Sequence, residues 1–569
     1  MWMTELPPFV PFFLAAALAL FTRGHVQSVI MLAAPLLGGL HLWFNVPAGI
    51  VYSLPILEYE LLLMRTDQLS LVFGYIFHIA AFVLVIYTLH LKDRLQHVAG
   101  LVYAGSAIGA TFAGDLITLF IFWELLAVSS VFLIWANRTT NAVQAGIRYL
   151  IYQVLSGVLL LAGALIHYHY TGSLAFEFIG LENPGGWLIL LAFGIKCAFP
   201  FLHTWLTEGY PASTHTGAAV LSVFTTKVAI YALARGYPGT EMLIYIGAVM
   251  ACFPIFYAVL ENDLRKVLSY SLINQLGFMV CGIGIGTALA LNGAVAHAFA
   301  HILYKSLLFM SMGAVMYRVG HTYASDLGGL YKSMPKTTVL CIIGAASISA
   351  VPLFSGFVAK SLVMTALLEQ GQVIVWLMLL FASAGVLHHA GIKVPFFAFY
   401  AHDSGIRTKE APMNMLVAMF IAAVLCVLIG SQPQYLYSIL PWEMDYWPYD
   451  LTHVLAQLQL LFFAALAFVW MEVKRYAPPE LHSTNLDAEW FYRKLIPAWI
   501  QRGLTVLSRA KESTMAAITT RVQSIQAEVS KSSTAKYYLA ESWPTGSMVF
   551  WIAAILAAFL LLGIFGVGR

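Results

Sequence analysis

The stretch LAFGIKCAFPFLHTWLTEGYPASTHTGAAVLSVFTTKVAIYALAR, residues 191–235, decides the fold of this chain. It places Lys196 inside one strongly apolar segment and Lys227 inside the next. An unpaired ammonium at the centre of a bilayer costs at least ~2.5 kcal/mol on insertion scales. Lysines kept at that depth are therefore candidates for a functional site, and the rest of the chain has to supply their partners.

The composition indicates a membrane protein. Of the 569 residues, 60% are hydrophobic and only 10% are charged, whereas soluble proteins carry about 25% charged residues. The net charge of +3 gives no reason to expect nucleic acid as a partner. The first residues, MWMTELPPFVPFF, lack a basic region and a small-residue cleavage site, so no cleaved signal peptide is expected.

Five cysteines are scattered singly through apolar segments, at positions 197, 252, 281, 341 and 426. None has the CxxC or Cys/His spacing that a zinc or iron–sulfur site needs. We therefore predict no metal site and no cofactor, and any redox chemistry has to lie in another chain.

Apolar runs long enough to cross ~30 Å of hydrocarbon recur along the chain with short polar breaks. They predict an all-α polytopic membrane protein with about sixteen transmembrane helices. The predicted segments are 8–22, 26–45, 69–91, 98–114, 115–136, 147–170, 186–203, 216–235, 241–261, 266–288, 292–316, 337–365, 372–400, 412–431, 453–473 and 547–566.

The loop charges give an independent orientation, because Lys and Arg in short loops favour the cytoplasmic side. Loops after even-numbered segments hold only Arg65 and Arg235. Loops after odd-numbered segments hold twelve basic residues: Arg23, Lys92, Arg94, Arg138, Arg148, Arg265, Lys266, Arg318, Lys332, Lys336, Arg407 and Lys409. The odd loops are therefore predicted to be cytoplasmic, with both termini outside.

Charged and titratable residues remain inside the predicted spans. His297, His301 and Lys305 are spaced i, i+4 and i+8, which stacks them along one helix face over two turns. Histidine and a desolvated lysine both exchange protons near neutral pH, so such a row is suited to relaying protons through water. The full series is Glu124, Lys196, Lys227, His297, His301, Lys305, Lys360 and Lys393.

Members of this series also have structural explanations. Lys305 and Lys393 lie where a long side chain can snorkel to an interface, and for Lys393 both explanations stay open. Glu124 and Lys227 could form a purely structural ion pair. We interpret other histidines as satisfied core or span-end residues, namely His78, His167, His169, His388 and His389. The number of buried charges, spread over several segments, favours a pathway.

Helix-breaking residues lie close to two of the lysines. Pro200 follows Lys196, and Pro352 and Gly356 precede Lys360. Breaks in mid-span usually mark a helix that lines a polar cavity, and matching breaks in two halves of a chain suggest internal repeats. We therefore predict two five-helix units of opposite topology, 98–235 and 241–400.

Four segments carry a resemblance to a known family: GDLITLFIFWELLAVSS, FGIKCAFPFLHTWL with TTKVAIYAL, AHAFAHILYKSLLFMSMGAV and SISAVPLFSGFVAKS. Over roughly residues 65–400 the chain resembles the antiporter-like membrane subunits of Mrp-type Na+/H+ antiporters, respiratory complex I and related hydrogenases. The resemblance implies a paired Glu124 and Lys196 and a Lys227 that links them towards the central axis. It also implies a relay and a terminal lysine near the exit, formed by His297, His301, Lys305 and Lys360.

The sequence departs from that pattern in two places. The sequence LTEGYPASTHTGAAVLSV places Glu208, Tyr210 and His215 at unusual positions. We expect His215 to cap a helix, and the alternative is a role in the proton entry path. Ser361 follows Lys360 where relatives often have an acidic residue, so Lys360 lacks that neighbouring counter-charge.

Beyond the repeats, the C-terminal part is predicted to be an amphipathic helix and a last span. Ile518, Val522, Ile525 and Val529 recur at helical spacing with polar residues on the other faces, which predicts a helix on the membrane surface or along a neighbouring subunit. The predicted regions are N-terminal helices 1–97, the repeats 98–235 and 241–400, additional spans 401–473, a cytoplasmic lateral helix 474–546 and a final span 547–569.

These features lead to a functional hypothesis. We expect a proton-translocating subunit of a multisubunit Na+/H+ antiporter in a bacterial or archaeal cytoplasmic membrane, working with other membrane subunits, H+ and Na+ within the lipid bilayer. The lateral helix followed by a sixteenth span resembles the arrangement in the L-type proton-translocating subunit of respiratory complex I. The sequences LDAEWFYRKL and GVLHHAGIKVPFFAFY look more like the D-type subunits of Mrp antiporters. The alternatives are a pumping subunit of a complex I-like oxidoreductase or hydrogenase, an energy-coupling subunit of an inorganic-carbon uptake complex, and a scaffold without transport.

Overall fold

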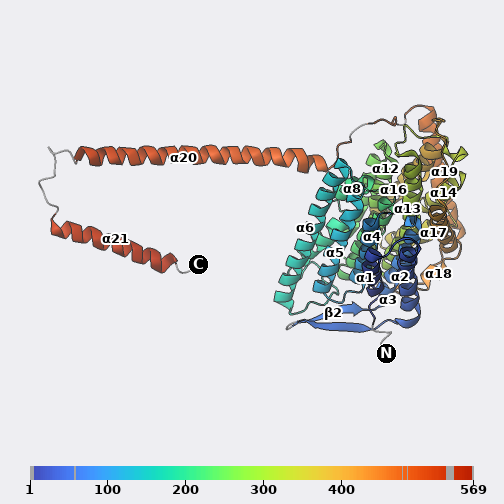
Figure 1. The fold of residues 1–569 in the computed structure, drawn as a ribbon, viewed down its shortest axis with the longest axis horizontal. Coiled ribbons are helices and arrows are strands. Elements are labelled where there is room, and N and C mark those ends of the chain that lie inside the picture. The colour runs from blue at the N-terminus through green and yellow to red at the C-terminus, as the bar shows by residue number, and fades with distance from the viewer. Residues whose placement is uncertain (1–5, 57–58, 477, 483–484, 533–543, 567–569) are drawn as a thin grey trace. The chain divides into compact units, whose positions relative to one another are not determined.

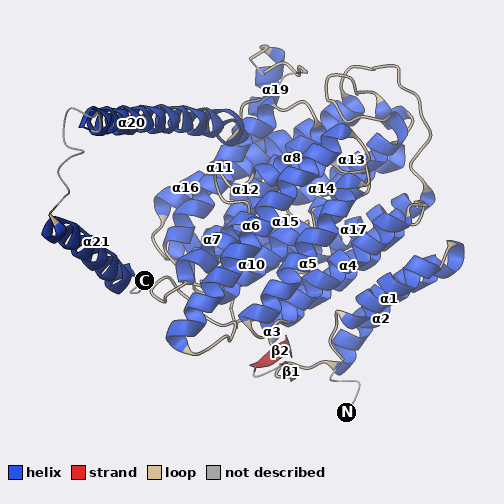
Figure 2. Cartoon of the chain, turned by 60° about the vertical axis from the view of Figure 1, so that its left-hand side comes forward, coloured by secondary structure: helices blue, strands red, loops and turns tan. Residues whose placement is uncertain are grey.

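The computed structural model of the chain describes residues 6–56, 59–476, 478–482, 485–532 and 544–566. It divides into two compact units, Met1–Asp487 and Ala488–Arg569. The first unit, called unit 1 below, is a bundle of packed helices with one short hairpin (Figures 1 and 2). The second, unit 2, consists of helices only in its described residues.

Within the described residues, eleven helical segments are long and apolar enough to cross a membrane. Nine are single helices: α2 (Gly24–Asn45), α3 (Gln68–Thr88), α5 (Leu116–Trp135), α6 (Thr140–Thr171), α11 (Met242–Leu260), α12 (Leu264–Ile285), α13 (Ala288–Val319), α17 (Met413–Ser431) and α19 (Leu451–Val473). Two are composite: α9 (Gly217–Leu221) with α10 (Thr225–Gly236), and α16 (Val373–Val386) with the π-helical η2 (Leu387–Lys393) and η3 (Phe396–Tyr400).

The other helices are shorter or less apolar within their described residues. The apolar ones are α1 (Val10–Phe21), α7 (Gly186–Lys196), α14 (Pro335–Ile348) and, in unit 2, α21 (Thr545–Gly566). The others in unit 1 are α4 (Arg94–Phe112), α8 (Thr204–Ala212), η1 (Leu330–Lys332), α15 (Ser355–Glu369) and α18 (Gln434–Tyr437). Each predicted span overlaps a helix or a broken pair of helices, and residues 113–115 separate α4 from α5 as predicted. The number of sixteen crossings stays a prediction.

A two-stranded hairpin is the element that the all-α prediction missed. Strands β1 (Val51–Ile56) and β2 (Tyr59–Arg65) pair antiparallel, with Val51 opposite Arg65 and an irregularity between Tyr52 and Ser53. Its backbone groups satisfy one another, so this connection between α2 and α3 needs no helix partner. The fold is therefore helical with one small hairpin at the end where the N-terminus lies (Figure 1).

Two parts of unit 1 repeat the same local features. The helices α6 and α13 each have 32 residues, begin after a capping threonine and end at a glycine in the left-handed region. Their preceding helices α5 and α12 are each capped by an aspartate, Asp115 and Asp263, that also forms an isolated β-bridge. These parallels agree with the predicted division at 98–235 and 241–400, which itself stays a prediction.

The helix breaks lie where proline and glycine predicted them. α7 ends at Lys196 and the next helix begins at Thr204, while α14 ends at Ile348 and α15 begins at Ser355. Both breaks hold two non-glycine residues at positive φ: Ala198 (61°) and Phe201 (66°) in one, Ala350 (57°) and Leu353 (73°) in the other. Such conformations cost roughly 1–3 kcal/mol each and persist only where the surroundings enforce them.

Unit 2 differs from the predicted lateral helix in extent. The π-helical η4 (Phe491–Leu495) leads into α20 (Ile496–Ser532), which has 37 residues and exposed apolar residues at the predicted positions. The start of the predicted region 474–546 is not helical: the described residues from 478 to 487 are irregular and belong to unit 1. Pro478 and Pro479 account for this, because proline lacks the amide that a helix interior uses. Residues 533–543 lie outside the described residues.

Candidate functional site: a buried row of cations

Lys196, at the C-terminal end of α7, is fully buried. Its Nζ donates to the Trp123 carbonyl oxygen at 2.5 Å and lies 4.5 Å from the centre of the Trp123 ring. Glu124 is next to Trp123 on α5, and its carboxylate interacts electrostatically with Lys196. The two nevertheless form no ion pair within 4.0 Å in the described part of the chain, and the buried Glu124 Oε1 has no hydrogen-bond partner there.

The Glu124 carboxylate instead packs against α6. A Cβ atom at Gly157 would overlap Glu124 Oε1, so only glycine leaves room for the carboxylate in this position. The pair that the resemblance implied is thus adjacent but open, with the lysine held by a neutral carbonyl.

Lys227 begins the second half of the site on α10. It is fully buried, and its Nζ donates to the Ser222 carbonyl oxygen at 2.5 Å and to Thr226 Oγ1 at 3.1 Å. Ser222 lies between α9 and α10, where the carbonyl groups at the end of a helix lack intrahelical donors. The ammonium therefore occupies a place that the helix interruption creates.

The row of three residues predicted on α13 is fully buried. His297 Nε2 lies 3.1 Å from Gln275 Oε1 of α12 and 2.9 Å from the Tyr304 hydroxyl. His301 makes no hydrogen bond through either ring nitrogen among the described residues, and its ring stands edge-on to Tyr304 at 5.3 Å. Lys305 Nζ also lacks a hydrogen-bond partner there and lies 5.9 Å from the Phe309 ring centre.

Lys360 on α15 uses the second helix break. Its Nζ donates to the carbonyl oxygen of Ile348 at 2.9 Å, and Ile348 is the last residue of α14. It lies 5.0 Å from the Phe278 ring centre. No carboxylate pairs with it among the described residues, in keeping with Ser361 at the neighbouring position.

Electrostatic interactions join five predicted residues into one cluster. His301 interacts with Lys227, Lys305, Lys360 and His297. Lys305 in turn interacts with Lys227 and Lys360. The cluster therefore gathers residues from three helices, α10, α13 and α15, around the centre of unit 1.

The Glu124–Lys196 pair lies beside this cluster. Cys197, the residue after Lys196, interacts with Lys227. The structure thus brings the seven predicted site residues into two adjacent groups.

Lys393 does not snorkel. It is 1% exposed and forms an ion pair with Glu480 at 2.9 Å. Its Nζ also donates to the carbonyl oxygens of Val259 at 2.6 Å and Glu261 at 2.8 Å, at the C-terminal end of α11. Burial raises the pKa of the Glu480 carboxyl, and the Lys393 ammonium only partly offsets this.

A second carboxylate from the same irregular segment enters unit 1. Asp487 lies 3.1 Å from His203 Nε2, and its Oδ2 accepts from the Tyr270 hydroxyl at 2.6 Å. All three side chains are buried. We call the described residues 478–482 and 485–487 the carboxylate segment. Its contacts could not be predicted from the sequence, because their partners lie over 80 residues away along the chain.

His215 and the unusual Glu208 have local partners, whereas the ring of His389 has none in the described part of the chain. His215 does not cap a helix, since Thr216 is the N-cap of α9; its Nε2 lies 3.1 Å from His90 Nε2. Glu208 pairs with Arg148. His389, interpreted as a core residue, is fully buried with no hydrogen bond to its ring among the described residues, and it interacts electrostatically with Lys305.

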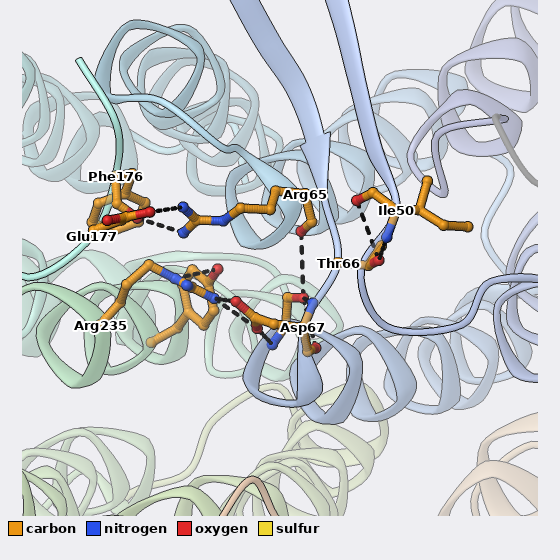
Figure 3. A network of polar contacts seen from close by, with 9 residues as sticks. Ile50, Arg65, Thr66, Asp67, Phe176, Glu177 and Arg235 are labelled. Carbon is orange, nitrogen blue, oxygen red and sulfur yellow. Dashed lines mark hydrogen bonds and ion pairs between the residues drawn. The ribbon is translucent and has the colours of Figure 1, made fainter. Parts of the chain in front are cut away.

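Arg65 and Arg235, the two basic residues that departed from the loop-charge pattern, both form ion pairs (Figure 3). Arg65 pairs with Glu177 at 3.3 Å, and Arg235 pairs with Asp67 at 2.7 Å. Burial would raise the pKa of Asp67, but Arg235 and the Ser70 amide outweigh it and leave the pKa below the ordinary value of 3.8. Arg65 thus joins strand β2 to the loop between α6 and α7, and Arg235 joins α10 to the start of α3.

Comparison with known proteins relates part of this chain to a known family. Residues 113–387 match the model described as NADH:quinone oxidoreductase/Mrp antiporter, transmembrane. Over this range, which is just under half of the chain, the protein is similar to the antiporter-like membrane subunits of this family. The matched range contains Glu124, all four lysines of the two groups and both histidines.

Proteins similar to this chain come from several kinds of complex. It is 29% identical over 357 residues to the D-type subunit of the Na+/H+ antiporter of Alkalihalophilus pseudofirmus, covering 58% of the chain and 72% of the relative. It is 26% identical over 436 residues to hydrogenase-4 component B of Escherichia coli, covering 67% of the chain but only 64% of that longer protein.

Solved structures of the family share the fold. The structure of the Mrp complex from Dietzia sp. matches with a TM-score of 0.75 and 22% identity, covering 98% of this chain and 62% of that one. Respiratory complex I from Thermus thermophilus matches with a TM-score of 0.68 and 17% identity, covering 80% and 99%. These family members are subunits of multisubunit membrane complexes.

Proposed function

We propose that this chain is the proton-translocating subunit of a multisubunit Na+/H+ antiporter and moves protons through its buried Lys, His and Glu residues. The observation that carries the proposal is the cluster of Lys227, His301, Lys305 and Lys360, which is buried with no carboxylate paired to it among the described residues. Several basic groups in one buried cluster cannot all be protonated at once without a large electrostatic cost, because their positive charges repel one another. A scaffold gains nothing from such residues, whereas a proton relay uses the competition among them.

The proton path follows the order of the groups. A proton enters at Glu124 and Lys196, passes through Lys227 to the α13 row, and leaves from Lys360. From Lys196 onwards, each step transfers one proton between neighbouring nitrogen atoms through water. His297 contributes a neutral imidazole that accepts on one ring nitrogen while it donates from the other.

The open Glu124–Lys196 pair supplies the coupling step. A carboxylate that approaches Lys196 stabilises its ammonium, and a carboxylate that withdraws favours release of the proton towards Lys227. Gly157 gives Glu124 a resting place away from the lysine. The mechanism therefore requires a partner or an ion that moves Glu124 between these two positions.

The finer topology belongs to the same proposal. The chain crosses a bacterial or archaeal cytoplasmic membrane sixteen times, with two inverted five-helix units and both termini outside. The paired Arg65 and Arg235 support this orientation, because their charges are neutralised by carboxylates on the predicted outer side. Na+ as the exchanged cation is supported by the Alkalihalophilus relative, which belongs to a Na+/H+ antiporter.

A second candidate is a pumping subunit of a complex I-like oxidoreductase or hydrogenase. It is favoured by the similarity to hydrogenase-4 component B and by the shared fold with complex I. In that case the same residues move protons, and a partner chain supplies redox energy.

The test uses everted membrane vesicles that contain the native assembly, with internal pH followed by a fluorescent dye. We expect Na+ addition to dissipate the proton gradient in vesicles with the wild-type chain, and Lys196→Ala to abolish this response. Lys409→Ala, which removes an exposed cation, should leave it unchanged. Acidification driven by an electron donor and indifferent to Na+ would favour the second candidate, and an unaltered Lys196→Ala response would refute the relay.

A further inference from the structure

A cavity lined by cations lies among the ends of three helices in unit 1. Its volume is about 710 Å³, and its walls come from the start of α2, the loop after α3 and the start of α4. The basic residues that line it are Arg23, His25, His90, Lys92, Arg94 and His97, and no Asp or Glu is among the described lining residues. A cavity with this lining attracts an anion.

No carboxylate among the described residues forms an ion pair with Arg23, Lys92 or Arg94. Arg94 Nη1 makes one hydrogen bond, to the Leu20 carbonyl oxygen at 3.3 Å. Arg23 and Lys92 form no ion pair within the described residues. The adjacent Asp93 is engaged elsewhere, because it accepts from the Leu95 amide at 3.0 Å and pairs with Arg138 at 3.3 Å.

The N-terminus of α2 adds to the positive field. Arg23 is its N-cap residue, and no side chain caps the helix. The first amides of this 22-residue helix therefore lie uncapped beside Gly24 and Ser28, which line the cavity. Unsatisfied amides at a helix start bind phosphate groups well.

Apolar surface leads from the cavity towards the middle of the bundle. A neighbouring crevice of about 40 Å³ shares Met31, Leu91 and His97 with the cavity and is otherwise lined mainly by apolar residues of α3, α4 and α9. On the outer side of α2, Val26 and Val29 are 61% and 65% exposed. Cations at a helix end followed by apolar surface fit a charged headgroup with acyl chains better than a free anion.

We propose that this cavity binds the phosphate headgroup of an anionic phospholipid. Its three permanent cations belong to loops predicted to be cytoplasmic, where the membrane leaflet is rich in anionic lipid. The site is independent of the proposed proton path.

The test measures lipid retention by native mass spectrometry of the purified full chain in detergent. Phosphatidylglycerol, phosphatidylcholine and inorganic phosphate are titrated separately. We expect phosphatidylglycerol to be retained in preference to phosphatidylcholine. The double variant Arg23→Gln/Arg94→Gln should bind it about 25-fold more weakly, from about fivefold for each cation.

A matched control removes the same charge elsewhere in the predicted cytoplasmic loops. Lys336→Gln/Lys409→Gln removes two exposed cations outside the cavity and should retain the lipid as wild type does. Equal retention by the Arg23→Gln/Arg94→Gln variant would overturn the proposal, and phosphate binding as tight as phosphatidylglycerol would replace the lipid by a free anion. If the double variant does not fold, Lys92→Gln at an exposed position should weaken retention about fivefold, and no change would overturn the site.

Discussion

Lys305 and Lys393 are both buried lysines, but only one of them has partners. Lys305 Nζ makes no hydrogen bond among the described residues. Lys393 Nζ is paired with Glu480 and donates to backbone carbonyl oxygens. An ammonium with partners contributes to stability, whereas one without them is retained at a cost that only function explains.

The first prediction compares the two lysines through methionine substitutions of similar volume. Lys305→Met should change the free energy of unfolding by less than about 1 kcal/mol, or raise it, because no partner is left unpaired. Proton transport by the assembly should fall at least about tenfold. Lys393→Met should instead lower stability by about 3–5 kcal/mol, because Glu480 is left buried and unpaired.

Thermal unfolding in detergent and transport in vesicles separate these outcomes. Glu480→Gln serves as the matched partner variant and should destabilise the chain in the same direction as Lys393→Met. A strongly destabilised Lys305→Met with normal transport would contradict the division between the two lysines.

The second prediction concerns pH and Asp67. Its pKa is lowered in the folded chain, so the stabilisation is fully present above the ordinary value of 3.8 and is lost as the pH falls through the lower, folded value. Asp67→Asn keeps the α3 N-cap and removes the charge. At pH 7 it should cost at most about 1 kcal/mol, because Asp67 is 39% exposed.

The measurement is the melting temperature of both chains between pH 8 and pH 3. The difference in melting temperature between the two chains should become smaller below pH 3.8. It should also become smaller in high salt, which screens the Asp67–Arg235 ion pair. A gap that is the same at pH 3 as at pH 7 would show that Asp67 acts without its charge.

At the residue scale, the sequence predicted which charges are buried but not what they contact. Helical spacing was sufficient to place His297, His301 and Lys305 on one face, since α13 is regular throughout. The contacts of Lys393 and His203 come from the carboxylate segment, and no periodic pattern connects residues so far apart. The contact of Glu124 with Gly157 could not be predicted from the sequence either, because it depends on how α5 packs against α6.

At the element scale, the two helix breaks are the features that place lysines against free carbonyl groups. Lys360 bonds to the last residue of α14 only because that helix stops at Ile348. Gly356 allows the start of α15 to lie close to the end of α14, since a Cβ there would overlap the Ser347 carbonyl oxygen. The break therefore depends on a close approach that only glycine permits.

The third prediction is that Gly356→Ala opens this break. Overpacking at so close a contact should cost about 2–3 kcal/mol and displace Lys360 from Ile348, so that transport falls as well. Gly100→Ala in α4 is the matched control, because a Cβ there meets nothing within 4 Å, and it should be neutral or slightly stabilising. Thermal unfolding of both variants tests this, and equal stability would mean that the break adapts without strain.

Apolar length predicted elements well where one helix crosses unit 1 without interruption. It failed at the hairpin, whose strands are too short for a span, and in the carboxylate segment, where two prolines end the helical pattern. Both exceptions are held by contacts with distant residues. In each case the tertiary partners, rather than local preference, determine the structure.

At the scale of the whole molecule, unit 1 contains its own hydrophobic core, and the residues of that core come from Phe9 to Leu440. The carboxylate segment follows this core in the sequence, and its Glu480 and Asp487 contact buried polar side chains of unit 1. Unit 1 is therefore complete only when the chain extends to residue 487.

The last prediction compares two truncated chains, 1–487 and 1–473. The longer one keeps both carboxylates and should remain monodisperse, with a melting temperature close to that of unit 1 in the full chain. The shorter one leaves Lys393 without its ion pair and His203 and Tyr270 without Asp487, so its free energy of unfolding should be lower by at least about 3 kcal/mol. The double variant Glu480→Gln/Asp487→Asn in the full chain should reproduce most of this loss, because it removes the same charges without shortening the chain. If 1–473 were as stable as 1–487, the carboxylate segment would be a passive connection, and its buried contacts would contribute nothing to the fold.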